Sequence, residues 1–318
     1  TGEAPGPTVV LTGGLHGNEP SGVFAAVELL ERLEHARHAL RGRVVAFAGN
    51  RQALARGVRF LARDLNRGWD APSLERLLRT PAGALAEDDR EHRELLDAFL
   101  ALEEEDAQPT ASPPGASLAF FDLHTTSGPS RPFACIGGSG ESLRLARALP
   151  ITSVVGLERA IAATMLSWCT SRGHVGISVE AGQHDDPASP RRHVSAVLVL
   201  LAAMGSLDPK REPRLVEQLE SHRAALARSA QGASRIVEVR HRHVVEPGDG
   251  FEMLPGFHSF DPVVAGQVLA HDRRGPIRAP EAGVVLMPRY QGQGEDGFFV
   301  ARDMTTREAT AHDRDPRR

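Results

Sequence analysis

The sequence predicts an α/β fold in which a mostly parallel, mixed sheet is flanked by helices, with an all-β domain at the C-terminal end. Up to about residue 205, short apolar runs alternate with stretches of helical spacing, a pattern typical of strand–helix–strand crossovers between parallel strands. From Ser234 onward, short β-like runs are separated by Gly, Pro and Asp instead. We therefore expect a catalytic domain at 1–205, a linker and helix at 206–230, and a β-rich capping domain at 231–318.

The first crossover is the clearest of these elements. Residues 8–11 form a short β-branched run, residues 21–40 carry apolar side chains at helical spacing, and residues 43–48 form a second apolar run. This order predicts two parallel strands joined by a helix. The arginine-rich segment 57–68 follows without clean periodicity, so we expect it to be a functional loop.

The remaining elements follow in chain order. A helical pattern at 73–102 is interrupted at 81–83, and a Pro/Ser/Thr spacer at 108–115 predicts a surface connection. Apolar runs at 117–123 and 175–179 predict two further strands, and 191–204 predicts a helix packed on the sheet. Further along the chain we expect a polar helix at 215–229, β-runs at 236–239, 243–245 and 298–300, and a frayed tail after Thr305.

Composition and charge exclude several classes of function. The 318 residues include 37 basic and 41 acidic side chains, with a formal net charge of -4, which gives no support to a nucleic-acid or anionic membrane partner. The chain has no apolar run of about 18 residues, and its start does not resemble a signal segment. Two cysteines, Cys135 and Cys169, are too few for a disulfide framework. We expect a cytoplasmic protein, and whether it forms a homo-oligomer stays open.

Side chains with metal-binding chemistry follow the ends of predicted strands. His16 and Glu19 lie in the glycine-rich loop 12–22 after the first strand, and His124 follows the third. The carboxyl ends of parallel strands meet at one edge of a sheet, where ligands bind. Two imidazoles and one carboxylate are the ligand set of hydrolytic zinc sites with an open position for water, and we expect the loop glycines to let backbone approach the ion. The alternative is that His16 caps the next helix and His124 is a satisfied core histidine.

Two carboxylates could support this metal site. Glu180 follows the next predicted strand, where a carboxylate can take a proton from metal-activated water. The alternative is a strand-end glutamate that faces solvent. Asp122 precedes His124 by two residues and on a strand points to the same side, so it either orients the imidazole or serves a turn or solvent role.

A possible substrate clamp lies in the loop at 57–68. Arg59, Asn66 and Arg67 are its candidate residues, because guanidinium groups bind carboxylates through paired hydrogen bonds. The loop therefore favours an acidic substrate, and a solvated basic loop is the alternative.

Four short motifs occur in a characteristic order: His16-Gly17-Asn18-Glu19, Asp64-Leu65-Asn66-Arg67, Asp122-Leu123-His124-Thr125-Thr126 and Val179-Glu180-Ala181-Gly182. Together they resemble the succinylglutamate desuccinylase/aspartoacylase family, a branch of the zinc carboxypeptidase-like fold. Each motif alone is common, but the set in this order and spacing is highly specific. The resemblance covers nearly the whole chain and implies the zinc carboxypeptidase-like α/β architecture.

The resemblance also implies roles for individual residues. It makes His16, Glu19 and His124 the zinc ligands and Glu180 the catalytic glutamate. Arg59, seven residues before the Asn-Arg pair, would polarise the scissile carbonyl, and Asn66 and Arg67 would hold the substrate's carboxylate. Tyr290 is a looser match to a substrate-contacting tyrosine of the C-terminal part. In some members of the family a second substrate arginine precedes the catalytic glutamate, and Arg172 is near that place but out of register.

The implied activity is that of a zinc-dependent amidohydrolase. It would remove an N-acyl group, acetyl or succinyl, from an acidic or other carboxylate-bearing amino acid, using one zinc ion per chain and Glu180 as general base and acid. A zinc carboxypeptidase acting on small peptides and a non-catalytic metal-binding module stay open as alternatives. Structural zinc sites usually have four protein ligands, so a set of three favours catalysis. Residues 277–285 resemble the turn of a lipoyl-like β-domain, but no modification site accompanies them and we expect no such cofactor.

Overall fold

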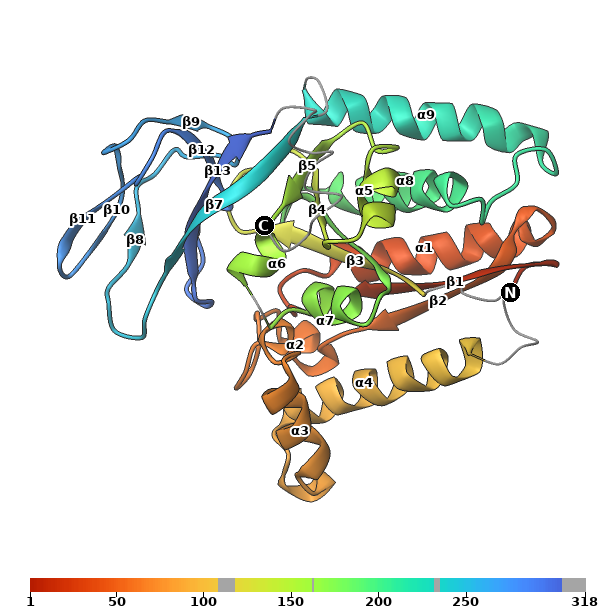
Figure 1. Ribbon diagram of the computed structural model, residues 1–318, viewed down its shortest axis with the longest axis horizontal. Helices are drawn as coiled ribbons and strands as arrows, with labels where there is room; N and C mark the ends of the chain where they lie inside the picture. Colours follow the sequence, from red (N-terminus) through yellow and green to blue (C-terminus); the bar gives the residue numbers. More distant parts are fainter. Residues whose placement is uncertain (108–117, 162, 232–234, 305–318) are drawn as a thin grey trace.

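The computed structural model describes residues 1–107, 118–161, 163–231 and 235–304. It has a large sheet covered by helices, with a β-rich extension formed by the C-terminal part (Figure 1). The predicted fold class is therefore confirmed. The spacer predicted at 108–115 and the tail predicted after Thr305 lie outside the described residues.

Within these residues the large sheet has ten strands. From one edge to the other they are β2 (Arg41–Ala48), β1 (Ala4–Gly13), β3 (Ala119–Thr126), β6 (Val175–Gln183), β4 (Phe133–Ile136), β5 (Thr152–Val155), β7 (Ile236–Val244), β13 (Asp296–Asp303), β12 (Gly283–Leu286) and β9 (Pro262–Val263). β1 pairs in parallel with β2 and β3, β3 with β6, and β5 with β4 and β7. The other neighbours are antiparallel. A second, antiparallel sheet contains β11 (Gly275–Arg278), β10 (Val268–Asp272) and β8 (Glu252–Met253).

Helices cover both faces of the sheet (Figure 1). α1 (Ser21–His35), α8 (Ser189–Ala203) and α9 (Pro213–Ala230) lie on one face, and α3 (Ala71–Arg79), α4 (Glu87–Asp106) and α7 (Met165–Ser171) lie on the other. The shorter helices are α2 (Arg51–Arg56), α5 (Gly140–Ala146) and α6 (Leu157–Ala160). Val9 and Leu11 of β1 pack with the first group, and Val10 packs with the second. This burial on both faces explains why the strand reads as an unbroken apolar run.

Several predicted elements have different bounds in the structure. The helix predicted at 21–40 ends at His35, and the pattern at 73–102 is divided into α3 and α4. The runs at 236–239 and 243–245 form the single strand β7, because β13 pairs with it across the polar residues between them. The sequence pattern missed β4 and β5, which have only four residues each.

The C-terminal β-strands continue the large sheet. β7 pairs with β5, with Ser153 opposite Ile236. Strands that lie before and after the predicted linker at 206–230 in sequence are therefore hydrogen-bonded to each other. α9 occupies most of that segment. The division into parts at 1–205, 206–230 and 231–318 stays a prediction.

Two further features concern the chain's chemistry as a whole. Cys135 and Cys169 are both buried and free.

Among the described helices, none is both long enough and apolar enough to cross a membrane.

Candidate metal and substrate site

Three neighbouring strands position the predicted site. β1, β3 and β6 are adjacent in the sheet, and His124 of β3 lies directly opposite Glu180 of β6. The sequence pattern placed both residues just beyond their strands, whereas the structure places them within the last residues of β3 and β6. The strands are longer than predicted because β6 is paired on both sides at this point, with Phe133 of β4 opposite Glu180 on the other side.

His16, Glu19 and His124 converge on one point. Glu19 Oε1 lies 2.9 Å from His16 Nδ1, and Glu19 Oε2 lies 3.0 Å from His124 Nδ1. One ligand atom from each residue lies within 4.8 Å of the others, and all three side chains are buried. The geometry therefore allows the three residues to share one metal ion.

The glycine-rich loop is shaped by its packing against two helices. A Cβ at Gly13 would lie 2.5 Å from the carbonyl carbon of Gly22 in α1, and one at Gly17 would lie 2.1 Å from that of Ala53 in α2. Gly14 has a φ of 71°, in the region that favours glycine. We expected these glycines to let backbone approach an ion. In the structure they let the loop fit between α1 and α2, which orients the side chains that the loop carries.

Each imidazole also meets a second carboxylate. His124 Nε2 lies 2.6 Å from Asp122 Oδ2, and His16 Nε2 lies 3.1 Å from Asp64 Oδ1. When the Nε2 proton of His124 is donated to Asp122, its Nδ1 keeps a lone pair that faces Glu19 and can ligate a metal ion. His16 Nε2 lies between Asp64 and a donor of Arg59, so Asp64 alone does not set the tautomer of His16. Asp122 therefore occupies the orienting position, not a turn or solvent position.

The charges of the site outweigh the cost of burying it. Burial raises the pKa of Glu19, but the charges and hydrogen bonds of His16 and His124 hold that pKa well below its usual range. Burial lowers the pKa of His124, but Asp122 and Glu19 together raise it well above its usual value. The buried Glu19 carboxylate is thus ionised, and nearby positive charge compensates it. A metal ion at the same place would supply positive charge of the same kind.

Glu180 differs from the other carboxylates of the site. Its side chain is buried, and no described group donates a hydrogen bond to its Oε2. Burial raises its pKa to about 8, although the charge of His124 acts in the opposite direction. Glu180 lines the same cavity, of about 120 Å³, as His16 and His124. A buried carboxyl in a cavity, with one oxygen that lacks a hydrogen-bond partner and a raised pKa, is a candidate proton-transfer group.

Arg59 reaches this cavity from the loop after α2. Its Nε donates to Asp64 Oδ2 at 2.9 Å, and its guanidinium lies 2.8 Å from His16 Nε2 and 3.6 Å from Glu19 Oε1. Only 8% of the residue is exposed. The guanidinium thus borders the cavity beside the potential metal ligands, where positive charge could act on a substrate oxygen.

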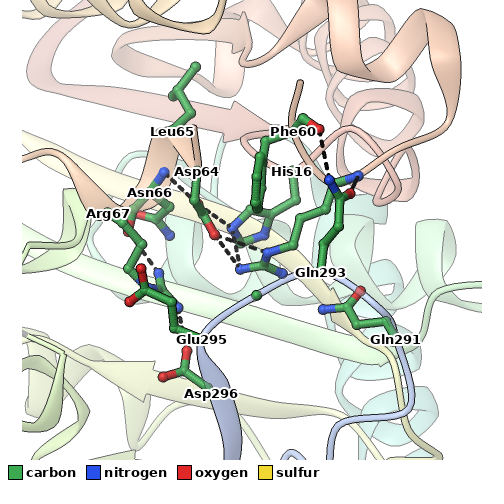
Figure 2. A network of polar contacts seen from close by, with 12 residues as sticks. His16, Phe60, Asp64, Leu65, Asn66, Arg67, Gln291, Gln293, Glu295 and Asp296 are labelled. Carbon is green, nitrogen blue, oxygen red and sulfur yellow. Dashed lines mark hydrogen bonds and ion pairs between the residues drawn. The ribbon is translucent and has the colours of Figure 1, made fainter. Parts of the chain in front are cut away.

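Asn66 and Arg67 are also at the cavity, but both are engaged by protein groups. Asn66 Oδ1 accepts from the backbone N–H of Met165, and its Nδ2 lies 3.5 Å from His124 Nε2. Arg67 Nη2 donates to Asp296 Oδ2 of β13 at 2.5 Å (Figure 2). The residues of the predicted clamp therefore lie at the cavity wall, with Arg67 paired to a carboxylate of the C-terminal part, and their role in binding substrate stays a prediction.

Tyr290 and Arg172 are directed elsewhere. The Tyr290 hydroxyl donates to the backbone carbonyl of Leu254 at 2.8 Å, and the residue is 38% exposed. Arg172 pairs with Glu103 of α4. Neither residue is among those that line the cavity, and the substrate role of Tyr290 stays a prediction.

Several residues that the sequence did not single out line the cavity, among them His184, Arg289 and Asp296. His184 is four residues after Glu180, so its place at a strand end was a usable signal. Its Nδ1 lies 2.8 Å from the hydroxyl of Thr125, and burial lowers its pKa. Arg289 and Asp296 had no comparable signal, because their position depends on how the C-terminal strands pack.

A buried set of two imidazoles and one carboxylate on an α/β sheet is the arrangement of the class that includes zinc carboxypeptidases. Residues 5–204 match the succinylglutamate desuccinylase/aspartoacylase catalytic domain. The chain therefore belongs to the succinylglutamate desuccinylase/aspartoacylase family, as the motifs predicted.

Curated relatives match only part of the chain. The succinylglutamate desuccinylase of Pseudomonas fluorescens is 34% identical over 124 residues, and that of Pseudomonas putida is 32% identical over 128 residues. Each match covers 38% of this chain and 31% of the relative. The chain thus matches about a third of the length of these relatives.

Solved structures match nearly the whole chain. The succinylglutamate desuccinylase/aspartoacylase of Rhodobacter sphaeroides superposes with a TM-score of 0.65 at 22% identity, covering 95% of this chain and 87% of that one. The product-bound ectoine utilization protein EutE (DoeB) of Ruegeria pomeroyi has a TM-score of 0.61 at 22% identity, with the same coverage. At this identity the similarity supports the fold alone.

Proposed function

We propose that the chain is a zinc-dependent amidohydrolase that removes an acetyl or succinyl group from the nitrogen of a carboxylate-bearing amino acid. The observation that carries this proposal is the unpartnered Oε2 of Glu180, in the same cavity as three potential metal ligands. A structural metal site has no use for such a carboxylate. Hydrolysis needs a base beside the water that attacks the substrate.

The donor set fits zinc. His16, Glu19 and His124 would hold the ion through two imidazole nitrogens and a carboxylate oxygen, and a set of three protein donors leaves a coordination position open. A zinc ion held there would supply Lewis acidity, which lowers the pKa of water and polarises a carbonyl oxygen. Asp122 would keep the His124 imidazole in the tautomer that leaves its Nδ1 free to ligate.

Glu180 would move the protons of the reaction. Its carboxylate would take a proton from the attacking water and return it to the leaving nitrogen of the amide. A general base works best when its pKa is close to the working pH, and burial raises the pKa of Glu180 toward that range. Because no described group donates to its Oε2, that oxygen is available to accept the proton.

Arg59, Asn66 and Arg67 would bind the substrate's oxygens. The Arg59 guanidinium would stabilise the negative charge that develops on the carbonyl oxygen, and one such donor is worth roughly 3 kcal/mol in known oxyanion sites. The Asn66 amide, beside His124, would donate to an oxygen of the same substrate. Arg67 would add positive charge to the cavity wall, shared with Asp296.

The test combines a substrate panel with a metal measurement on the purified protein. Amine release from N-acetyl and N-succinyl amino acids is measured, together with zinc per chain by atomic emission. Changing Glu180 to glutamine should lower kcat by a factor on the order of 10²–10⁴ while zinc stays bound. The Glu217→Gln variant, at an exposed glutamate of α9, should leave both quantities unchanged.

Each contrary outcome identifies a different error. Full turnover in Glu180→Gln would remove the assigned role of that residue. Wild-type protein that neither binds zinc nor turns over any substrate after zinc addition would indicate the non-catalytic metal-binding module. Cleavage of small peptides in preference to N-acyl amino acids would indicate a carboxypeptidase.

A further inference from the structure

Three arginines line the cavity beside the potential metal ligands, and they differ in their partners. The Arg59 guanidinium pairs with Asp64 at 2.9 Å, and that of Arg67 pairs with Asp296 at 2.5 Å. In the described part of the chain, no carboxylate pairs with the third, Arg289. Arg289 is therefore the arginine of this cavity that forms no ion pair with a described carboxylate.

Arg289 is nevertheless fixed in place. Its Nη1 donates to the backbone carbonyl of Gly294 at 2.6 Å, and its Cζ lies 4.8 Å from the centre of the Phe251 ring. Its backbone N–H donates to the carbonyl of Gly297 at 2.9 Å. Within the described residues, no group accepts from its Nε or Nη2. The guanidinium is thus oriented in advance and keeps two donors for the bidentate geometry that a carboxylate requires.

Asp296 is the nearby acidic residue that could compete for Arg289, but two other arginines already bind it. Its Oδ2 accepts from Arg67 at 2.5 Å, and its Oδ1 accepts from Arg242 at 2.6 Å. Burial lowers the pKa of Arg289, while the charge of Asp296 raises it. The guanidinium of arginine nevertheless stays a cation at neutral pH. Asp296 is therefore already paired twice, whereas Arg289 has no ion-pair partner among the described residues.

The position of Arg289 fits the far end of a substrate. It lines both the cavity of about 120 Å³ at the potential metal ligands and a larger neighbouring cavity of about 1050 Å³, and Arg67 and Gly294 also line both. An acyl group at the potential metal ligands would leave the amino-acid half of the substrate at this junction. A carboxylate there would meet Arg289 before it could displace Asp296 from Arg67.

We propose that Arg289 binds the carboxylate of the substrate's amino-acid half and so determines the preference for N-acyl amino acids with a free carboxylate. Arg67, which is paired with Asp296, then forms the cavity wall beside this carboxylate. This inference rests on the proposed function, because it assigns the substrate class of the same cavity.

The test compares substrates that differ in a single group. An N-acetyl amino acid and its carboxamide, which lacks the negative charge, are assayed on the zinc-loaded full chain. Changing Arg289 to glutamine should raise KM for the carboxylate form by on the order of 10- to 100-fold, the range expected for one charge-assisted pair, with little change for the carboxamide. Arg289→Lys keeps the positive charge but cannot donate two parallel hydrogen bonds, so its KM for the carboxylate form should lie between those of wild type and Arg289→Gln. Arg274→Gln, a matched change at an arginine that is 77% exposed, should behave as wild type.

A binding measurement separates this inference from the proposed function. Calorimetric titration of the carboxylate ligand into zinc-loaded protein does not depend on turnover. Binding that requires Arg289 without any hydrolysis would support the inference and refute the amidohydrolase. Hydrolysis with an unchanged carboxylate preference in Arg289→Gln would refute the inference alone. Absence of carboxylate binding in the wild type, or loss of the preference in Arg67→Gln but not in Arg289→Gln, would also overturn it.

Discussion

Replacing Glu180 with glutamine should change how the stability of the metal-free protein depends on pH. Burial raises the pKa of Glu180 from 4.5 to about 8 in the folded state. Between these two values the folded chain keeps a proton that the unfolded chain has released, so the free energy of unfolding falls as pH rises. One such proton changes that free energy by about 1.4 kcal/mol per pH unit. Over the window of about 3.5 units, the effect is on the order of 5 kcal/mol at most.

The assay is urea unfolding of chelator-treated protein at several values between pH 5 and pH 8. Wild type and Glu180→Gln should be similar near pH 5, and the variant should become more stable than wild type as pH rises, by several kcal/mol at pH 8. The exposed control Glu217→Gln should follow wild type throughout. Parallel stability curves for wild type and Glu180→Gln would refute the reasoning, because they would mean that Glu180 is ionised across the whole range.

Two further predictions concern residues that support the cavity wall. Asp88, which is 2% exposed, accepts three backbone N–H groups from the loop carrying Arg67, and also the amide of Asn50. Asp88→Asn should therefore lower the unfolding free energy in urea by roughly 2–4 kcal/mol and raise KM, and an unchanged stability would contradict this. Asp296→Asn should release Arg67 for a ligand, so calorimetry should show severalfold tighter binding of a carboxylate. The control Asp303→Asn, at the exposed end of β13, should show no change, and weaker binding in Asp296→Asn would count against the reasoning.

The position of the potential metal ligands could be predicted from sequence because it depends on local patterns. Strand ends and parallel crossovers are encoded by apolar runs and helical spacing, and parallel strands bring their carboxyl ends to one edge of the sheet. His16, Glu19 and His124 lie at that edge for this reason, and Asp122 meets His124 because alternate residues of a strand share a face.

The contacts of the proposed substrate-binding residues could not be predicted in the same way. Arg67 pairs with Asp296 across a sequence separation of 229 residues, and no periodic pattern in either segment indicates that contact. The sequence around Tyr290 indicated which segment the residue belongs to, but not where its side chain points. Its hydroxyl donates to a backbone carbonyl of the C-terminal part. In the sequence, Asp88 resembles an ordinary acidic residue in the first turn of a helix. Its hydrogen bonds to the loop at 57–68 become evident only in the structure.

The two halves of the candidate site are held by different parts of the fold. The potential ligands and Glu180 belong to β1, β3, β6 and the loop after β1, and buried packing on both faces fixes these strands. Arg289 lies in the segment between β12 and β13, and Asp296 begins β13. Hydrogen bonds to Arg59 and Ser127 and the ion pairs of Asp296 join this region to the rest of the chain. A substitution in that segment can therefore alter which carboxylate is bound without disturbing the groups that would perform hydrolysis. Connecting segments on a rigid scaffold commonly carry specificity for this reason, so differences in substrate preference within this fold should map to the segment between β12 and β13.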